Sequence, residues 1–219
     1  MAKAARRAKQ PHVSPSAHGA VALRGALALD LINTEIMDRG KPRDTLPSLE
    51  ALARWWEAAC ERYPEQCVIA GADGTKVWTS ELFAAVLELR RALRTLITQV
   101  VESDAVDKEA LKPVNAILAL GFSALERTEE GTVKAVMRVR DPAKGSVLVP
   151  IALSASRLFS ESDWRRLHQC KNDRCILFFY DTTKNGARRW CSADCMNRAR
   201  SIQQYQLAKK MASQTASVE

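Results

Sequence analysis

Four of the six cysteines in this 219-residue chain form two close pairs in its last quarter. Four residues separate Cys170 from Cys175, three separate Cys191 from Cys195, and fifteen lie between the pairs. Zinc favours thiolate ligands, and a short loop brings two thiolates to one ion at little cost in chain entropy. Four thiolates complete a tetrahedral shell and leave no position for a substrate water. The spacing therefore predicts one structural Zn²⁺ bound by all four cysteines.

The other candidate ligands fit this pattern less well. Cys60 and Cys67 lie at an expected helix end and in a loop, without a partner pair, so we interpret them as ordinary thiols. His168 lies two residues before Cys170 and could replace a cysteine, although we favour a hydrogen-bonded structural role. The sequence shows neither a secretory signal nor a long apolar segment that could span a membrane. We therefore expect a cytoplasmic protein, in which disulfides are rare.

Positive charge gathers on the same part of the chain. The formal net charge is +8, and residues 157–210 contain 12 basic and five acidic side chains, against 16 and 19 in residues 26–156. This asymmetry suits a polyanionic partner, because neutralisation of phosphates supplies much of the affinity for nucleic acid. The candidate phosphate contacts are the cations nearest the last cysteine pair: Lys184, Arg188, Arg189, Arg198 and Arg200.

Three of these cations also have a structural interpretation. Arg198 could pair with Asp181, and Arg188 or Arg189 could brace the zinc thiolates. Asn197 could read an adenine edge, although we favour a role as a helix cap or as a partner of a cysteine sulfur. The choice between contact with DNA and support of the metal site stays open at this point.

A smaller polar group precedes the cysteines by more than a hundred residues. Asp30 and Asn33 lie beside apolar Leu31 and Ile32 at helical spacing, and could line a pocket for a small-molecule effector. The favoured alternative is a helix end whose backbone is satisfied by short polar side chains. We find no dinucleotide or phosphate-binding loop, metalloprotease motif or nucleophile elbow, and therefore expect no enzyme.

Apolar periodicity and capping residues predict a mostly helical body. Helices are expected over residues 25–35, from Ser48 to about Tyr63, from Thr79 or Ser80 to about residue 100, and over 107–119, where Pro113 should kink or open the helix. Residues 133–139 and 146–149 predict a β-hairpin, and residues 151–159 return to helical spacing.

Secondary structure in the cysteine-rich region should serve the metal. Ser162 is expected to cap a short helix, residues 176–180 to form a strand, 184–186 a turn and 188–190 a returning strand. A helix over residues 192–205 is the candidate for insertion into a DNA groove. We divide the chain into a disordered basic tail (1–19), an α+β body (20–160), a zinc-finger domain (161–210) and a flexible tail (211–219), and expect body and finger to pack together.

The cysteine-rich residues resemble the CGNR zinc-finger family. Its pattern is Cys-x4-Cys, Phe-Tyr-Asp, Arg-Arg-Trp-Cys-Ser, and then Cys-Gly-Asn-Arg at the start of a helix. Besides the first cysteine pair, the matching residues are Phe179, Tyr180, Asp181, Arg188, Arg189, Trp190, Cys191, Ser192, Cys195, Asn197 and Arg198. Two features depart: Met196 replaces the family glycine, and the last cysteine pair encloses three residues where four are expected. Because methionine does not readily adopt positive φ, the turn into the last helix should change.

Upstream, the segment LALDLINTE at residues 27–35 resembles the ABATE domain that accompanies this finger in bacterial stress-induced transcription regulators. The two resemblances imply an α+β fold, with a mostly helical N-terminal domain carrying a small β-hairpin and a C-terminal treble-clef or ribbon-like zinc finger. They imply a DNA-binding regulator with an effector-sensing body. The alternative is a zinc-braced protein-interaction module with a small-molecule-binding body and no nucleic acid. The oligomeric state stays open, with a homodimer among the options.

Overall fold

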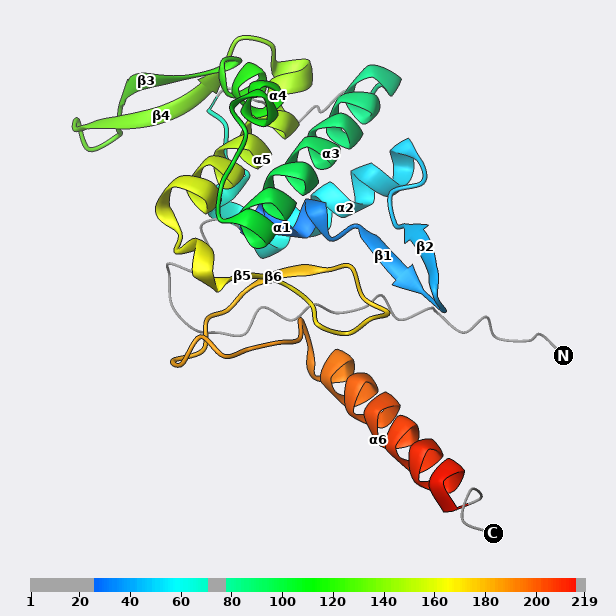
Figure 1. The fold of residues 1–219 in the computed structure, drawn as a ribbon. Coiled ribbons are helices and arrows are strands. Elements are labelled where there is room, and N and C mark those ends of the chain that lie inside the picture. Colours follow the sequence, from blue (N-terminus) through cyan, green and yellow to red (C-terminus); the bar gives the residue numbers. More distant parts are fainter. Residues whose placement is uncertain (1–25, 71–77, 216–219) are drawn as a thin grey trace, which may run out of the picture.

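The computed structural model describes residues 26–70 and 78–215 of the chain. Most of this part is helical, and Figure 1 shows the helices of the body gathered above the zinc-finger region. The helices of the body are α1 (Ala26–Ile32), α2 (Leu49–Arg62), α3 (Ser80–Ser103), α4 (Lys108–Leu118) and α5 (Pro142–Glu161). The described residues thus confirm the expected α+β class. No helix among them is both long enough and apolar enough to cross a membrane.

The strands of the described residues form three separate antiparallel pairs. They are β1 (Glu35–Asp38) with β2 (Lys41–Asp44), β3 (Gly121–Arg127) with β4 (Val133–Val139), and β5 (Leu167–Gln169) with β6 (Phe178–Tyr180). The register places Gly121 opposite Val139 in the longest pair and Leu167 opposite Tyr180 in the pair next to the cysteines. The arginine side chain of Arg90 on α3 holds β2 to the helices, through two hydrogen bonds of 2.8 and 2.6 Å to the carboxylate of Asp44.

Capping side chains set the helix boundaries that the sequence predicts best. The hydroxyl of Ser48 accepts a hydrogen bond from the Ala51 amide, and that of Thr79 accepts one from the Leu82 amide. These bonds satisfy amides that have no partner within the first turn of a helix. The expected starts of α2 and α3 are therefore confirmed. Helix α4 also forms where expected, and it continues through Pro113 to Leu118.

The expected hairpin between residues 133–139 and 146–149 is wrong. Strand β4 pairs instead with the preceding strand β3, and residues 146–149 belong to helix α5. Asp141 caps α5, Pro142 occupies its first turn, and the helix buries eleven of its residues, among them the whole run from Gly145 to Ala152. A helix that is buried on all sides lacks the polar stripe that distinguishes an amphipathic helix from a buried strand.

Two further local expectations need correction. The short 3₁₀ helix at Trp164–Arg166 is capped by Asp163, whose carboxylate accepts a hydrogen bond from the Arg165 amide, rather than by Ser162. The last helix, α6, covers Ala193–Thr215 and so extends beyond residue 205 into the first residues of the expected flexible tail. The expected basic tail at residues 1–19 lies outside the described residues.

One apolar core extends from the body into the zinc-finger region. Trp56, Leu93 and Ile151 are fully buried at its centre. The same core includes Leu167 of β5 and Phe178 of β6, which are 2% and 3% exposed. A second, small cluster surrounds the cysteines and contains Phe179. Strand β6 therefore turns one side chain toward the body and its neighbour toward the metal site, as the alternation of side chains along a strand requires.

Candidate metal centre and basic surface

The four predicted ligands meet at one point. Cys170 follows β5, Cys175 lies shortly before β6, Cys191 precedes α6, and Cys195 is in the first turn of α6. All four Sγ atoms lie within 4.8 Å of one another, with 3.8 Å between Cys175 and Cys191 and 3.5 Å between Cys191 and Cys195. A tetrahedral zinc ion with Zn–S bonds of about 2.3 Å needs S···S separations of about 3.8 Å. The geometry fits one zinc ion held by a strand pair and a helix start, as expected for a treble-clef finger.

The electrostatics of the cluster also fit a cation. Hydrogen bonds from the thiols of Cys175 and Cys191 lower the pKa of Cys170. Hydrogen bonding to Cys170 raises the pKa of Cys175, and bonding to Cys170 and then Cys175 raises the pKa of Cys191. One thiol can thus ionise only at the expense of its neighbours. A divalent cation removes this conflict, because it favours deprotonation of the coordinating thiols and offsets two of the four negative charges of their thiolates. The four cysteines are the ligands of one structural zinc.

Asn172 holds the two ligand pairs together. Its side chain is buried and donates a 2.9 Å hydrogen bond to the carbonyl of Cys195, while its Oδ1 accepts one of 3.0 Å from the Arg174 amide. Its own carbonyl accepts a hydrogen bond from the Cys175 amide. Asn172 is not among the residues predicted for the site. An asparagine within a four-residue loop between ligands is the signal that could have found it, because asparagine favours such turns.

Asp181 organises the loop between the two ligand pairs. The carboxylate is fully buried and accepts hydrogen bonds of 2.8 Å from the Thr183 amide and 2.7 Å from the Arg188 amide. Burial raises the pKa of Asp181, but these hydrogen bonds outweigh it and leave the pKa below its ordinary value. The predicted pair between Asp181 and Arg198 does not form, since Asp181 is engaged by backbone amides. Arg198 lies exposed on α6.

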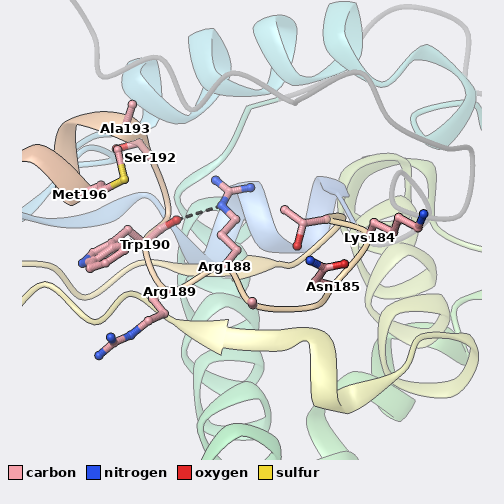
Figure 2. Close-up of a pocket in the computed structure, with 10 residues that line it drawn as sticks. Lys184, Asn185, Arg188, Arg189, Trp190, Ser192, Ala193 and Met196 are labelled. Atoms are coloured by element: carbon pink, nitrogen blue, oxygen red, sulfur yellow. Dashed lines mark hydrogen bonds between the residues drawn. The ribbon is translucent and has the colours of Figure 1, made fainter.

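Arg188 braces the backbone at the third ligand. Its Nε donates a 2.9 Å hydrogen bond to the carbonyl of Trp190, which Figure 2 shows as a dashed line, and its Nη2 donates one to the carbonyl of Cys191. The guanidinium lies 4.8 Å from the ring centre of Phe179. The expected brace on the thiolates thus acts on carbonyls instead. The expected returning strand at 188–190 is wrong, because β6 pairs with β5 and this segment is a loop.

The loop and the start of α6 enclose a hollow of about 550 Å³. Three of the five predicted phosphate contacts line it: Lys184, Arg188 and Arg189. Ser192 and Ala193 contribute the start of α6 to its wall (Figure 2). Ser192 caps the helix, because its hydroxyl accepts a 3.2 Å hydrogen bond from the Cys195 amide. The hollow therefore combines cations with the positive end of a helix dipole.

Met196, at the position of the family glycine, lies inside α6 and lines the same hollow. Among the described residues, positive φ occurs only at two non-glycine positions, Arg39 and Asp104, besides three glycines. The turn into α6 therefore needs no left-handed residue at position 196, and the expected disturbance does not arise. Gly186, with φ of +61°, supplies the left-handed residue of the predicted turn over residues 184–186.

Four of the predicted contact residues are exposed cations. Lys184 and Arg189 lie on the loop, and Arg198 and Arg200 lie on α6. Within the described part of the chain, none of the four forms an ion pair with a carboxylate. Arg189 lies over the ring of Trp190 at 5.4 Å. Figure 1 shows α6 pointing away from the body, so the two cations on this helix are carried outward.

The predicted effector residues have different partners. Asp30 forms an ion pair of 2.9 Å with Arg62, and its burial raises its pKa although Arg62 acts in the opposite direction. Asn33 instead bonds to the backbone of Phe178 in β6. These contacts join α1 and the turn after it to other structural elements, and they do not satisfy the backbone of the helix end itself. His168 packs on Phe179 with ring centres 5.7 Å apart, and its buried Nε2 has no hydrogen-bond partner among the described residues.

Comparison with known proteins agrees with this architecture. The family model ABATE, described as "Putative stress-induced transcription regulator", matches residues 25–162. The chain belongs to the ABATE family. A second model, the CGNR zinc finger, matches residues 166–206 and thereby includes all four cysteines of this ABATE protein. The resemblance drawn from the sequence is confirmed. A search of curated proteins found no match. The chain is thus a zinc-binding member of a family described as "Putative stress-induced transcription regulator".

Proposed function

We propose that the zinc finger of this ABATE protein binds double-stranded DNA and that the body adjusts this binding in response to a small-molecule effector. The observation that carries the DNA-binding part is the set of exposed cations around the start of α6, at Lys184, Arg189, Arg198 and Arg200, which form no ion pair with a carboxylate of the described residues. Cations without a carboxylate partner keep their full attraction for phosphates. The effector part of the proposal goes beyond the family description, which names a stress-induced transcription regulator and no ligand.

The shape of the finger supports the same proposal. Helix α6 contains 23 residues and is therefore about 35 Å long, close to one turn of a DNA duplex. It projects from the protein in Figure 1, and a single helix fits the major groove. Lys184 and Arg189 would hold a phosphate at its base, Arg198 and Arg200 would follow the backbone, and the exposed Gln203 and Gln204 would face base edges.

Salt titration of the zinc-loaded full-length protein on a duplex of random sequence tests the proposal. If each of the four cations neutralises one phosphate, log K falls with log salt at a slope of about −3.6, which is a loss of roughly 150-fold between 50 and 200 mM. Alanine at any one of these positions should reduce the slope by about 0.9. Arg91→Ala is the matched control, because Arg91 is an exposed arginine on α3 of the body.

Two results would contradict DNA binding. One is the absence of duplex binding at low salt with zinc loaded, and the other is binding whose salt slope is the same in the Arg91 control and in the four finger variants. A stable acidic protein partner in place of DNA would favour the interaction-module alternative. The proposal also places the protein in the cytoplasm and assigns it no catalytic activity. Selection of bound duplexes from a random pool would then identify the target site.

A further inference from the structure

One edge of β6 pairs with β5, and a side chain of the body forms hydrogen bonds with the other edge. Asn33 follows α1, and its Nδ2 donates a 2.8 Å hydrogen bond to the carbonyl of Phe178. The Phe178 amide donates a 2.9 Å hydrogen bond back to Asn33 Oδ1. A side-chain amide thus takes the place of a neighbouring strand at one residue. Because Phe178 is only 3% exposed, loss of Asn33 would leave two buried backbone groups unsatisfied.

Arg94 of α3 makes a second connection next to the first. Its Nη1 donates a 2.9 Å hydrogen bond to the carbonyl of Ile32 at the end of α1, and its Nη2 donates one of 3.3 Å to the carbonyl of Ile176. Glu35 holds the guanidinium with a contact of 3.1 Å to Nε. The charged group also lies 5.4 Å from the ring centre of Phe178. Arg94 therefore ties the end of α1 to the segment leading into β6.

These connections reach the metal site within one residue. Ile176, which accepts from Arg94, directly follows the zinc ligand Cys175. Phe178 lies in the main core, whereas its neighbour Phe179 lies in the cluster around the cysteines. Any shift of residues 176–178 relative to α1 would thus move a ligand of the zinc ion, and any loss of the ion would release a strand that α1 and α3 hold.

We propose that Asn33 and Arg94 form a latch that couples the stability of α1 and α3 to zinc binding in the finger. Zinc binding contributes free energy to folding of the finger, and the latch passes part of it to the body. Thermodynamic linkage makes the coupling reciprocal. If zinc binding stabilises α1 by a given factor, loss of the α1 contacts lowers the affinity for zinc by the same factor. Asn33 and Arg94 act as positioning residues, and this role does not depend on whether the partner is DNA.

Hydrogen exchange of the full-length protein, with zinc and after its removal by a chelator, tests the latch. In the wild type, removal of zinc should accelerate exchange in α1 and in the half of α3 that contains Arg94 by about tenfold or more, the factor that about 1.4 kcal/mol of coupling produces. In Asn33→Ala and Arg94→Met this zinc-dependent acceleration should shrink severalfold, with the shared apolar core accounting for what remains, while zinc still protects the start of α6. The affinity for zinc, measured by competition with a chelator, should fall about tenfold.

Matched controls separate the latch from general destabilisation. Asn115→Ala and Arg91→Met change the same residue types at exposed positions on α4 and α3, and should keep the wild-type response. A residue with a purely structural role would raise exchange equally with and without zinc and leave the zinc-dependent difference intact, and that result in the latch variants would overturn the proposal. If Asn33→Ala does not fold, Asn33→Asp replaces it. The carboxylate of this variant can still accept a hydrogen bond from the Phe178 amide but cannot donate one to the Phe178 carbonyl. If zinc removal accelerates exchange in this variant as much as in the wild type, that result would equally overturn the proposal.

Discussion

Alanine substitution at two adjacent arginines of the finger should affect different properties: protein stability at Arg188 and DNA binding at Arg189. Arg188 donates two hydrogen bonds to the carbonyls of Trp190 and Cys191 and lies over the ring of Phe179. Hydrogen bonds from a charged donor contribute about 1.5–3 kcal/mol each and a cation–π contact about 0.5–1 kcal/mol. These contributions sum to about 3.5–7 kcal/mol. Because Arg188 is only half-buried, solvent screening reduces this sum, and we expect Arg188→Ala to lower the free energy of unfolding by about 2–4 kcal/mol.

Arg189 is exposed, and its guanidinium lies over the ring of Trp190. Its carbonyl accepts a hydrogen bond from the Lys171 amide, which alanine at this position would retain. Arg189→Ala should therefore reduce stability by at most about 1 kcal/mol. It should instead reduce the salt slope of DNA binding by about 0.9, whereas Arg188→Ala should leave the slope of the folded protein unchanged.

Urea denaturation of the zinc-loaded variants, followed by circular dichroism, measures the first difference, and the anisotropy of a labelled duplex measures the second. Equal losses of stability in Arg188→Ala and Arg189→Ala would refute the brace on the carbonyls. A reduced salt slope in Arg188→Ala would show that its guanidinium contacts phosphate and is not held within the finger.

Three other substitutions follow from the structure. Cys175→Ser should abolish binding of one zinc per chain, measured by metal analysis, while Cys60→Ser, remote from the sulfur cluster, should retain it. Burial raises the pKa of Asp44, but hydrogen bonds from Arg90 outweigh it and hold the pKa below its ordinary value. Asp44→Asn should thus lower the free energy of unfolding by about 1–2 kcal/mol at pH 7, after allowance for the exposure of the carboxylate. This loss of stability should persist down to about pH 4 and should shrink as the pH falls further. The reason is that the carboxylate of Asp44 stabilises the fold above its unfolded-state pKa, and this contribution is lost as the pH falls through the lower folded-state pKa. A loss of stability that does not change with pH would contradict the ion pair. Gly145→Ala would place a β-carbon 2.7 Å from a side-chain carbon of β4. We therefore expect the free energy of unfolding, measured by urea denaturation, to fall by about 1 kcal/mol, although alanine favours a helix more than glycine does. A more stable variant would exclude that close approach.

Local signals in the sequence predict the parts of the fold that local interactions determine. The starts of α2 and α3 depend on Ser48 and Thr79, whose hydroxyls act within three residues, so these boundaries are visible without a structure. Helix α5 is different, because its residues 145–152 are buried on every side by other elements. An apolar run of this kind is compatible with a strand or with a helix, and only its neighbours decide.

The metal site and its surroundings also contain one part that local signals predict and one part that they do not. Spacing alone places Cys170, Cys175, Cys191 and Cys195 around one ion, because short loops constrain the ligands of each pair. The partner of Asn33 could not be predicted, since it lies 145 residues away in β6. The polar residues at the end of α1 can be identified in the sequence. Whether they face a ligand, solvent or another part of the chain depends on the fold, which the sequence pattern does not give.

The shared core of body and finger has a consequence for how this protein could be re-engineered. A finger cut from the chain at residue 166 would carry Leu167 and Phe178 with it, two buried apolar side chains that belong to the core of the body. Grafted onto another protein, such a finger would expose them and would lack Asn33 and Arg94. A chimera that exchanges fingers between proteins should therefore carry compatible residues at positions 33 and 94, so that the transplanted unit is defined by its contacts and not by its chain boundary.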